Sequence, residues 1–185
     1  QDLERAVRLY EEAWYCHPVL TEGHAHMAAL NLSTLLKNLG RTKEASAWLL
    51  KAADEVHDTL AQYQLAHAYS HGTNGFEVNL EKAKEYNQRA ADNGMVLAQH
   101  NLGCLYFDSA TPDYEAAVHY FTKAHFQEYY WSTLNLAGMY ARGQGVPQNF
   151  ATAHLLLREV ATFGTEENKK AAQDVLAQVR KLEAG

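Results

Sequence analysis

One nine-residue stretch recurs along this chain, and its spacing restricts the possible folds more than any other feature. The reference copy, residues 98–106, reads Ala-Gln-His-Asn-Leu-Gly-Cys-Leu-Tyr. The shared pattern is a small residue, a Leu four places later, a small residue beside that Leu, and usually Tyr or Leu at the ninth place. The copies lie 33, 37, 34 and 40 residues apart and begin at Ala28, Ala61, Ala98, Ser132 and Ala172. Internal similarity at this period is typical of a helical repeat array.

A second stripe of small, large and small residues follows each of the first four copies. Its members are Ala45, Trp48 and Ala52; Ala83, Tyr86 and Ala90; Ala117, Tyr120 and Ala124; and Ala153, Leu156 and Val160. Each pattern lies on one face of a helix, and the small residues let two such helices approach closely. The repeat unit is therefore predicted to be a helical hairpin, and stacked hairpins bury what one hairpin leaves exposed.

The periodicity predicts ten helices, whose ends are marked by capping residues and by glycine or proline. The predicted ranges are 2–16, 22–39, 43–56, 58–71, 80–92, 96–107, 112–126, 130–142, 150–162 and 166–183. In the first helix we expect Ala6, Leu9, Tyr10 and Ala13 to face inward.

Six positions are expected to set helix ends. Pro18 should stop the first helix, because proline is incompatible with a helix interior. The predicted N-caps are Thr21, Asn79, Thr111, Asn149 and Thr165, whose side chains can accept a backbone N–H of the first turn.

The repeats divide the chain into segments of one elongated domain, 1–185. The predicted segments are 1–18, the second helix of a truncated repeat; 19–57, 58–95, 96–129 and 130–164, four repeats; and 165–185, a C-terminal capping helix with a polar outer face. Because the chain opens in the middle of a repeat, we expect further sequence before residue 1.

Composition excludes several classes of partner. The 185 residues are 47% apolar, enough for a core. The net charge of −6 and a pI near 5.9 argue against general binding of nucleic acid or anionic membranes. Cys16 and Cys104 lie in different repeats without metal-type spacing. Two cysteines are too few for a disulfide framework, so we expect reduced thiols and a reducing intracellular compartment such as the cytoplasm.

These motifs resemble the Sel-one-like repeat, a relative of the tetratricopeptide repeat. The resemblance covers about residues 58–164 and rests on three motifs: Ala98, Leu102, Gly103 and Tyr106; the loop with Gly143, Gly145, Val146 and Asn149; and Lys82, Ala83, Tyr86, Ala90, Ala91 and Gly94. The N-terminal part is closer to the plain tetratricopeptide form, and Glu128 replaces the closing glycine of one repeat. The family resemblance implies an all-α, right-handed α-solenoid that holds complexes together without chemistry of its own.

In such arrays the first helices line the concave wall, so the resemblance also implies a partner-binding surface. The candidate residues are Tyr63, Gln64, His67, His71, His100, Asn101, Cys104, Phe107, Asn135 and Arg142. Gln64, Asn101 and Asn135 belong to a column of amides that could bind an extended peptide backbone. The same amides could instead tie neighbouring hairpins together.

The sequence favours a non-catalytic protein-interaction scaffold that docks a peptide or helix of a partner protein. No catalytic, cofactor or metal residue is assigned. An alternative is the regulatory or substrate-docking region of a larger enzyme, for example a kinase. A remote alternative is a metal-binding sensor, since His67, His71, His100 and Cys104 offer ligands that zinc accepts. Ten histidines are scattered through the chain, however, and chance could place several on one wall.

Overall fold

The computed structural model describes residues 2–15 and 22–185, and only the backbone of 22–26. The predictions for Cys16, Pro18 and Thr21 lie outside the described residues. The described ranges form ten helices and no strand: α1 (Asp2–Tyr15), α2 (Glu22–Asn38), α3 (Thr42–Asp54), α4 (Thr59–His71), α5 (Leu80–Asp92), α6 (Val96–Phe107), α7 (Tyr114–His125), α8 (Tyr130–Arg142), α9 (Phe150–Phe163) and α10 (Glu166–Glu183).

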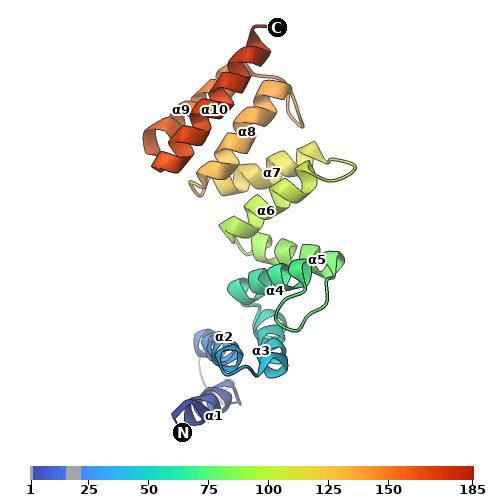
Figure 1. Cartoon of the computed structure of the whole chain (residues 1–185), viewed down its shortest axis with the longest axis vertical. Helices are drawn as coiled ribbons and strands as arrows, with labels where there is room; N and C mark the ends of the chain where they lie inside the picture. Colours follow the sequence, from blue (N-terminus) through green and yellow to red (C-terminus); the bar gives the residue numbers. More distant parts are fainter. Residues whose placement is uncertain (1, 16–21) are drawn as a thin grey trace. The chain divides into compact units, whose positions relative to one another are not determined.

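Every predicted helix is present, and the observed ends lie within two residues of the predicted ones. Figure 1 shows successive helices paired into hairpins: α2 with α3, α4 with α5, α6 with α7, and α8 with α9. The prediction of an all-α helical-repeat solenoid is confirmed.

Three of the predicted N-caps are confirmed by hydrogen bonds. The side-chain oxygen of Asn79 accepts the N–H of Lys82 at 3.0 Å, and that of Asn149 accepts the N–H of Thr152 at 2.9 Å. Thr165 accepts the N–H of Asn168 at 3.3 Å, and the Asn168 side chain bonds back to the Thr165 N–H, which completes a capping box.

The predicted start of α7 at Thr111 and Pro112 is wrong. The helix begins at Tyr114, and Asp113 is its cap, with its carboxylate accepting the Ala116 N–H at 3.0 Å. The backbone N–H of Asp113 donates to the carbonyl of Tyr106 at 3.0 Å. This bond ties the loop back to α6 and holds Asp113 outside the helix.

The chain divides into two compact units, residues 1–95 and 96–185. The boundary coincides with the predicted junction between two repeats. The first unit contains α1 to α5, and its core includes Leu32 and Leu65, which are completely buried. Trp14 packs edge-to-face on Trp48 with ring centroids 5.7 Å apart. Burial of a leucine side chain such as Leu32 or Leu65 contributes about 1.5–3 kcal/mol to the stability of the fold.

The buried face of α1 agrees only in part with the prediction. Val7 and Trp14 are buried and Tyr10 packs against the same core, whereas Leu9 is 55% exposed and Ala6 and Ala13 are only partly covered. The reason is that α1 packs on α2 and places Trp14 against Trp48 of α3, which leaves Leu9 exposed.

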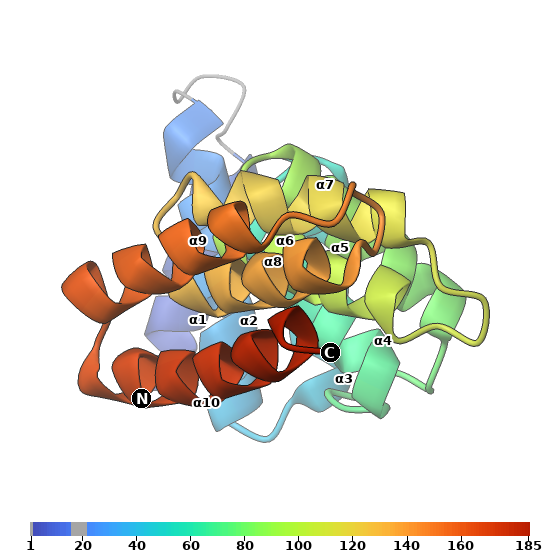
Figure 2. The ribbon, with the colours of Figure 1, turned by 90° about the horizontal axis from the view of Figure 1, so that it is seen from above.

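The second unit contains α6 to α10. In Figure 2 the helices α8, α9 and α10 lie side by side, in agreement with their mutual contacts. Gly103 of α6 lies directly against Phe121 of α7, which is 1% exposed. The small residue beside Leu102 of the repeat pattern therefore creates the space that the aromatic ring fills.

The tyrosine at the ninth place of the pattern has the same packing role in two hairpins. Tyr69 of α4 stacks on Tyr86 of α5 with ring centroids 5.8 Å apart and planes 5° apart. Tyr106 of α6 stacks on Tyr120 of α7 at 5.7 Å and 2°. In both hairpins, therefore, the residue at the ninth place of the first helix stacks on the large residue of the second helix.

Glu128, which replaces a glycine of the repeat pattern, adopts the left-handed region with φ of 59°. This conformation costs an L-residue about 1–2 kcal/mol. We therefore expect Glu128→Gly to raise the free energy of unfolding by roughly 1 kcal/mol, measured by urea denaturation. The matched control is Glu85→Gly in the exposed middle of α5, which should lower stability by about 1 kcal/mol. A loss of stability in Glu128→Gly would contradict this account of the turn.

Candidate functional site

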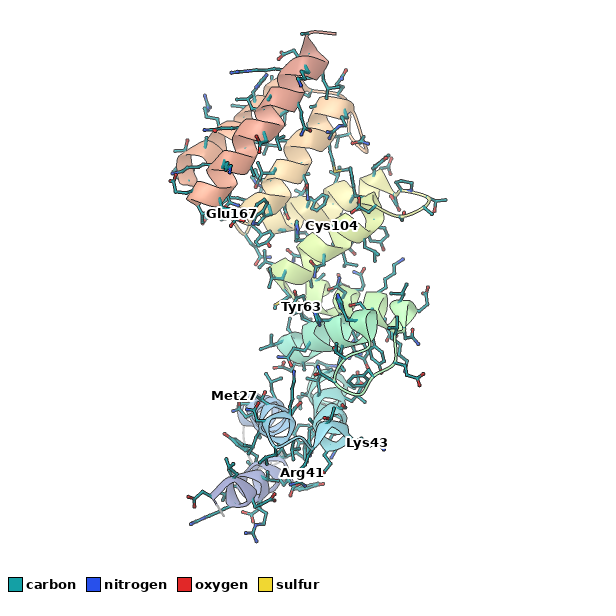
Figure 3. All side chains as sticks on the ribbon, in the orientation of Figure 1. Met27, Arg41, Lys43, Tyr63, Cys104 and Glu167 are labelled. Atoms are coloured by element: carbon teal, nitrogen blue, oxygen red, sulfur yellow. The ribbon has the colours of Figure 1, made fainter. Side chains whose placement is uncertain are left out.

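The ten residues predicted to line the first-helix wall are divided between the two units. Tyr63, Gln64, His67 and His71 lie on α4 in the first unit. His100, Asn101, Cys104 and Phe107 lie on α6, and Asn135 and Arg142 lie on α8, in the second unit. Figure 3 labels Tyr63 on α4 and Cys104 on α6.

A groove of about 400 Å³ lies between α2, α3 and α4 in the first unit. Tyr63, Gln64 and His67 of α4 line one side, and Lys37 and Asn38 of α2 line the other. Tyr63 and Gln64 are half-buried, whereas the side chains from α2 are exposed. The groove therefore presents one phenol ring, one imidazole, three amides and one ammonium group to a ligand.

The loop after α4 contributes Asn74 to the lining of this groove. Ser46 of α3 donates to the carbonyl of Thr42 at 2.8 Å and also makes a short contact with the carbonyl of Asn74 in that loop. Asn74 itself lines the groove and takes a left-handed φ of 55°. The polar wall is thus held by contacts within the first unit.

His67 and His71 form an exposed pair one helical turn apart. Their rings stack with centroids 4.2 Å apart and planes 19° apart. Nδ1 of His71 lies 3.0 Å from the backbone carbonyl oxygen of His67 and 2.9 Å from Oγ of Ser70. The ring of His71 is therefore oriented by its own helix.

His100 is engaged inside the second unit. Its Nδ1 lies 2.9 Å from Oγ of the buried Ser132, and its Nε2 lies 3.6 Å from Sγ of Cys104. Its ring also contacts those of Tyr129 at 4.9 Å and Phe121 at 5.7 Å. This histidine ties α6 to α8, so packing accounts for much of its position.

Burial changes the proton affinity of this pair. Desolvation lowers the pKa of His100. Desolvation, and secondarily the charge of Asp108, raises the pKa of the Cys104 thiol to about 11. At neutral pH the imidazole is therefore neutral and the thiol protonated, which is the unreactive form of cysteine.

The lowered pKa of His100 makes stability depend on pH. Its contribution is present above the unfolded-state pKa near 6.5 and is lost as the pH falls through that value, because the unfolded chain then binds the extra proton. We expect the melting temperature to fall between pH 7 and pH 5, and to fall less in His100→Gln. His119→Gln, at an exposed position on α7, is the control and should retain the wild-type slope. If the melting temperature fell as steeply with pH in His100→Gln as in the wild type, other groups would be responsible for the effect.

The remaining candidates in the second unit differ in exposure. Asn101 and Asn135 are exposed, as a partner-binding role requires. Phe107 instead packs on Tyr114 at 5.5 Å, and Nη2 of Arg142 donates to Gln178 of α10 at 3.2 Å.

Other amides, which the sequence analysis missed, link the two helices of a hairpin. The Asn93 side chain donates to Gln62 at 3.0 Å in the first unit, and that of Gln127 donates to Gln99 at 2.8 Å in the second. Gln62 and Gln99 both stand at the second place of the repeat pattern. That recurrence was the signal that could have revealed them.

The described part of the chain contains no group of three or more His, Cys, Asp or Glu side chains placed to hold a metal ion. Of the four ligands considered for zinc, two lie in each unit. None of the described helices combines the length and apolarity needed to cross a bilayer.

Repeated hairpins with exposed first-helix surfaces define a class of helical-repeat proteins. The sequence pattern of the Sel1 repeat matches residues 1–13, 59–95, 96–124 and 132–161, together more than half of the chain. The chain belongs to the Sel1 repeat family. Repeats of this family generally mediate protein–protein interactions.

Several known proteins are similar to this chain. The sel1-like repeat-containing protein L21 of Acanthamoeba polyphaga mimivirus is 36% identical over 85 residues, which are 46% of this chain and 15% of that protein. A crystallised Sel1 repeat protein from Oxalobacter formigenes superposes with a TM-score of 0.68 at 28% identity, over 85% of this chain and 48% of the other. The Escherichia coli protective antigen c5321, which has an SLR fold, superposes with a TM-score of 0.63 at 26% identity, over 80% of this chain and 33% of the other. The chain thus spans less than half the length of each.

Proposed function

We propose that the chain is a non-catalytic scaffold that docks a peptide or helix of a partner protein on the surface of its first helices, the wall predicted to be concave. The observation that carries this proposal is the groove of about 400 Å³ between α2, α3 and α4, which contains three of the residues selected from the sequence.

The chemistry of the groove suits a polypeptide ligand. The amides of Asn38 and Gln64 can each donate and accept hydrogen bonds, as a peptide backbone requires. Tyr63 offers a large apolar ring with a polar end, a combination that is favoured in protein interfaces. Lys37 adds a positive charge that an acidic or carbonyl-rich segment can approach.

The state of the nucleophiles supports a role without catalysis. Cys104, the described cysteine, is a partly buried thiol with a raised pKa, and both ring nitrogens of the neighbouring His100 have partners within the fold. Activation of a cysteine nucleophile requires the opposite, a lowered pKa.

The proposal is tested by replacing Tyr63 and Gln64 together with alanine. A partner that co-purifies with the wild-type chain from its native source should be captured at least about tenfold less well, since truncation of a central interface residue costs 1–2 kcal/mol or more. The far-UV circular dichroism should remain unchanged.

The control is Lys170→Ala with Asp174→Ala, two exposed positions on α10. This variant should capture the partner as the wild type does. Undiminished capture by the Tyr63 and Gln64 variant would place the binding surface elsewhere.

The alternative of a docking region within a larger enzyme is favoured by one observation, namely that the chain covers only 15% to 48% of its relatives. It would use the same groove to hold a substrate or regulator. An activity assay of the full-length protein with and without the Tyr63 and Gln64 substitutions tests it. Loss of partner capture without any activity in the full-length protein would favour the scaffold.

A further inference from the structure

We infer that His67 and His71 form a two-ligand site for a divalent transition-metal ion of the Ni²⁺, Cu²⁺ or Zn²⁺ type. The two imidazoles lie on the same face of α4, four residues apart, and both are exposed. Their stacked rings, 4.2 Å apart, are close enough for small side-chain rotations to direct one nitrogen of each toward a shared ion. Such a site needs metal–nitrogen distances of about 2.0–2.1 Å.

Nδ1 of His71 is engaged by its own helix, which leaves Nε2 as the nitrogen that can bind a metal. Nδ1 lies 3.0 Å from the His67 carbonyl oxygen and 2.9 Å from Oγ of Ser70. In the tautomer that donates to the carbonyl, the hydrogen is on Nδ1 and the lone pair is on Nε2. Metal-binding histidines usually donate their other N–H to a carboxylate, a backbone carbonyl or water, which fixes ring orientation and increases basicity.

The ligand type selects the class of ion. Imidazole nitrogen suits Cu, Ni and Zn, whereas Mg²⁺ and Ca²⁺ prefer oxygen. Two protein ligands are fewer than a structural zinc site requires, which is consistent with the lack of any three-ligand group in the described part of the chain. The remaining coordination positions would be filled by water.

This site differs from the four-residue zinc cluster considered from the sequence. It lies entirely on one helix of the first unit and requires neither His100 nor Cys104. It also does not depend on the proposed docking function. Its test uses the purified chain and a metal ion alone, without a partner, so that the two proposals can fail separately.

The test is a titration of the chain with NiCl₂, followed by calorimetry and by the thermal unfolding transition. We expect Ni²⁺ to raise the melting temperature, since bidentate binding across one turn favours the folded helix over the unfolded chain. His67→Ala and His71→Ala should each weaken Ni²⁺ binding by more than about tenfold. Alanine is the best helix former, so both variants should retain α4.

Three controls make the result decisive. His119→Ala removes an exposed histidine on α7 and should leave Ni²⁺ binding unchanged. MgCl₂ should cause no shift, and Ni²⁺ binding should weaken in acid, because protons compete with the metal ion for imidazole nitrogen. Wild-type affinity in either His67→Ala or His71→Ala, or an equal loss in His119→Ala, would show that the ion binds elsewhere among the ten histidines and would overturn the inference.

Discussion

Gly103→Ala is expected to lower the free energy of unfolding by about 1–3 kcal/mol, although alanine is the better helix former. A Cβ atom at this position would lie 2.5 Å from Cδ1 and Cε1 of Phe121 and 2.9 Å from its Cγ. Phe121 is 1% exposed, so its ring has no free space to move into. The α6 and α7 helices would have to separate. Urea denaturation followed by circular dichroism measures the loss, and Gly103→Leu should be more damaging still.

Gly138→Ala on α8 is the matched control. Its Cβ would come within 2.8 Å of Nη1 of Arg142, the far end of a flexible and exposed side chain that can move away. We expect this variant to be neutral or more stable by up to about 1 kcal/mol, the usual advantage of alanine over glycine in a helix. Equal losses in the two variants would mean that close helix packing is not the function of Gly103.

Gly145→Ala is expected to cost about 3 kcal/mol, because two effects add. The residue has φ of 69°, which costs an alanine about 1–2 kcal/mol. Its Cβ would also collide with the backbone C and O of Tyr114 and lie 2.8 Å from the backbone N of Glu115, at the start of α7. Overpacking of this kind costs about 1–3 kcal/mol more, and backbone atoms cannot rotate away. The same denaturation experiment measures the loss.

Gly94→Ala separates the two effects. Gly94 also has positive φ, 88°, but no atom lies within 4 Å of its Cβ position. It should therefore lose only the conformational part, about 1–2 kcal/mol. If Gly94→Ala were as destabilising as Gly145→Ala, the collision of the added Cβ with the backbone of α7 would contribute nothing to the loss at Gly145.

The helices could be predicted from the sequence because each repeat carries its own signals. The small residues beside Leu65 and Leu102 are required by close helix packing, and the caps at Asn79 and Asn149 are local hydrogen bonds. The errors have a different origin. The start of α7 is displaced by the bond from Asp113 to Tyr106, which depends on how the loop folds back.

The burial of α1 could not be read from its own pattern for a related reason. The repeat pattern places Leu9 inward, but burial depends on which neighbours are present. In the first unit, α1 packs on α2 and contacts Trp48 of α3 through Trp14, and Leu9 remains exposed.

The candidate site was only partly predictable. Periodicity identified Tyr63, Gln64 and His67, because residues on one helical face share a surface. It could not show that Asn74 of the loop after α4 would line the same groove, since that depends on how the loop folds back. It also could not separate Asn101, which is exposed, from Phe107, which packs on Tyr114.

The edge-to-face pair of Trp14 and Trp48 has a practical consequence. Two of the three tryptophans of the chain are buried together in the unit 1–95, and the third, Trp131, lies in the unit 96–185 at 37% exposure. Intrinsic tryptophan emission is therefore weighted toward the N-terminal half and blue-shifted while that half is intact. The chain carries its own optical label, which reports melting of one half in preference to the other.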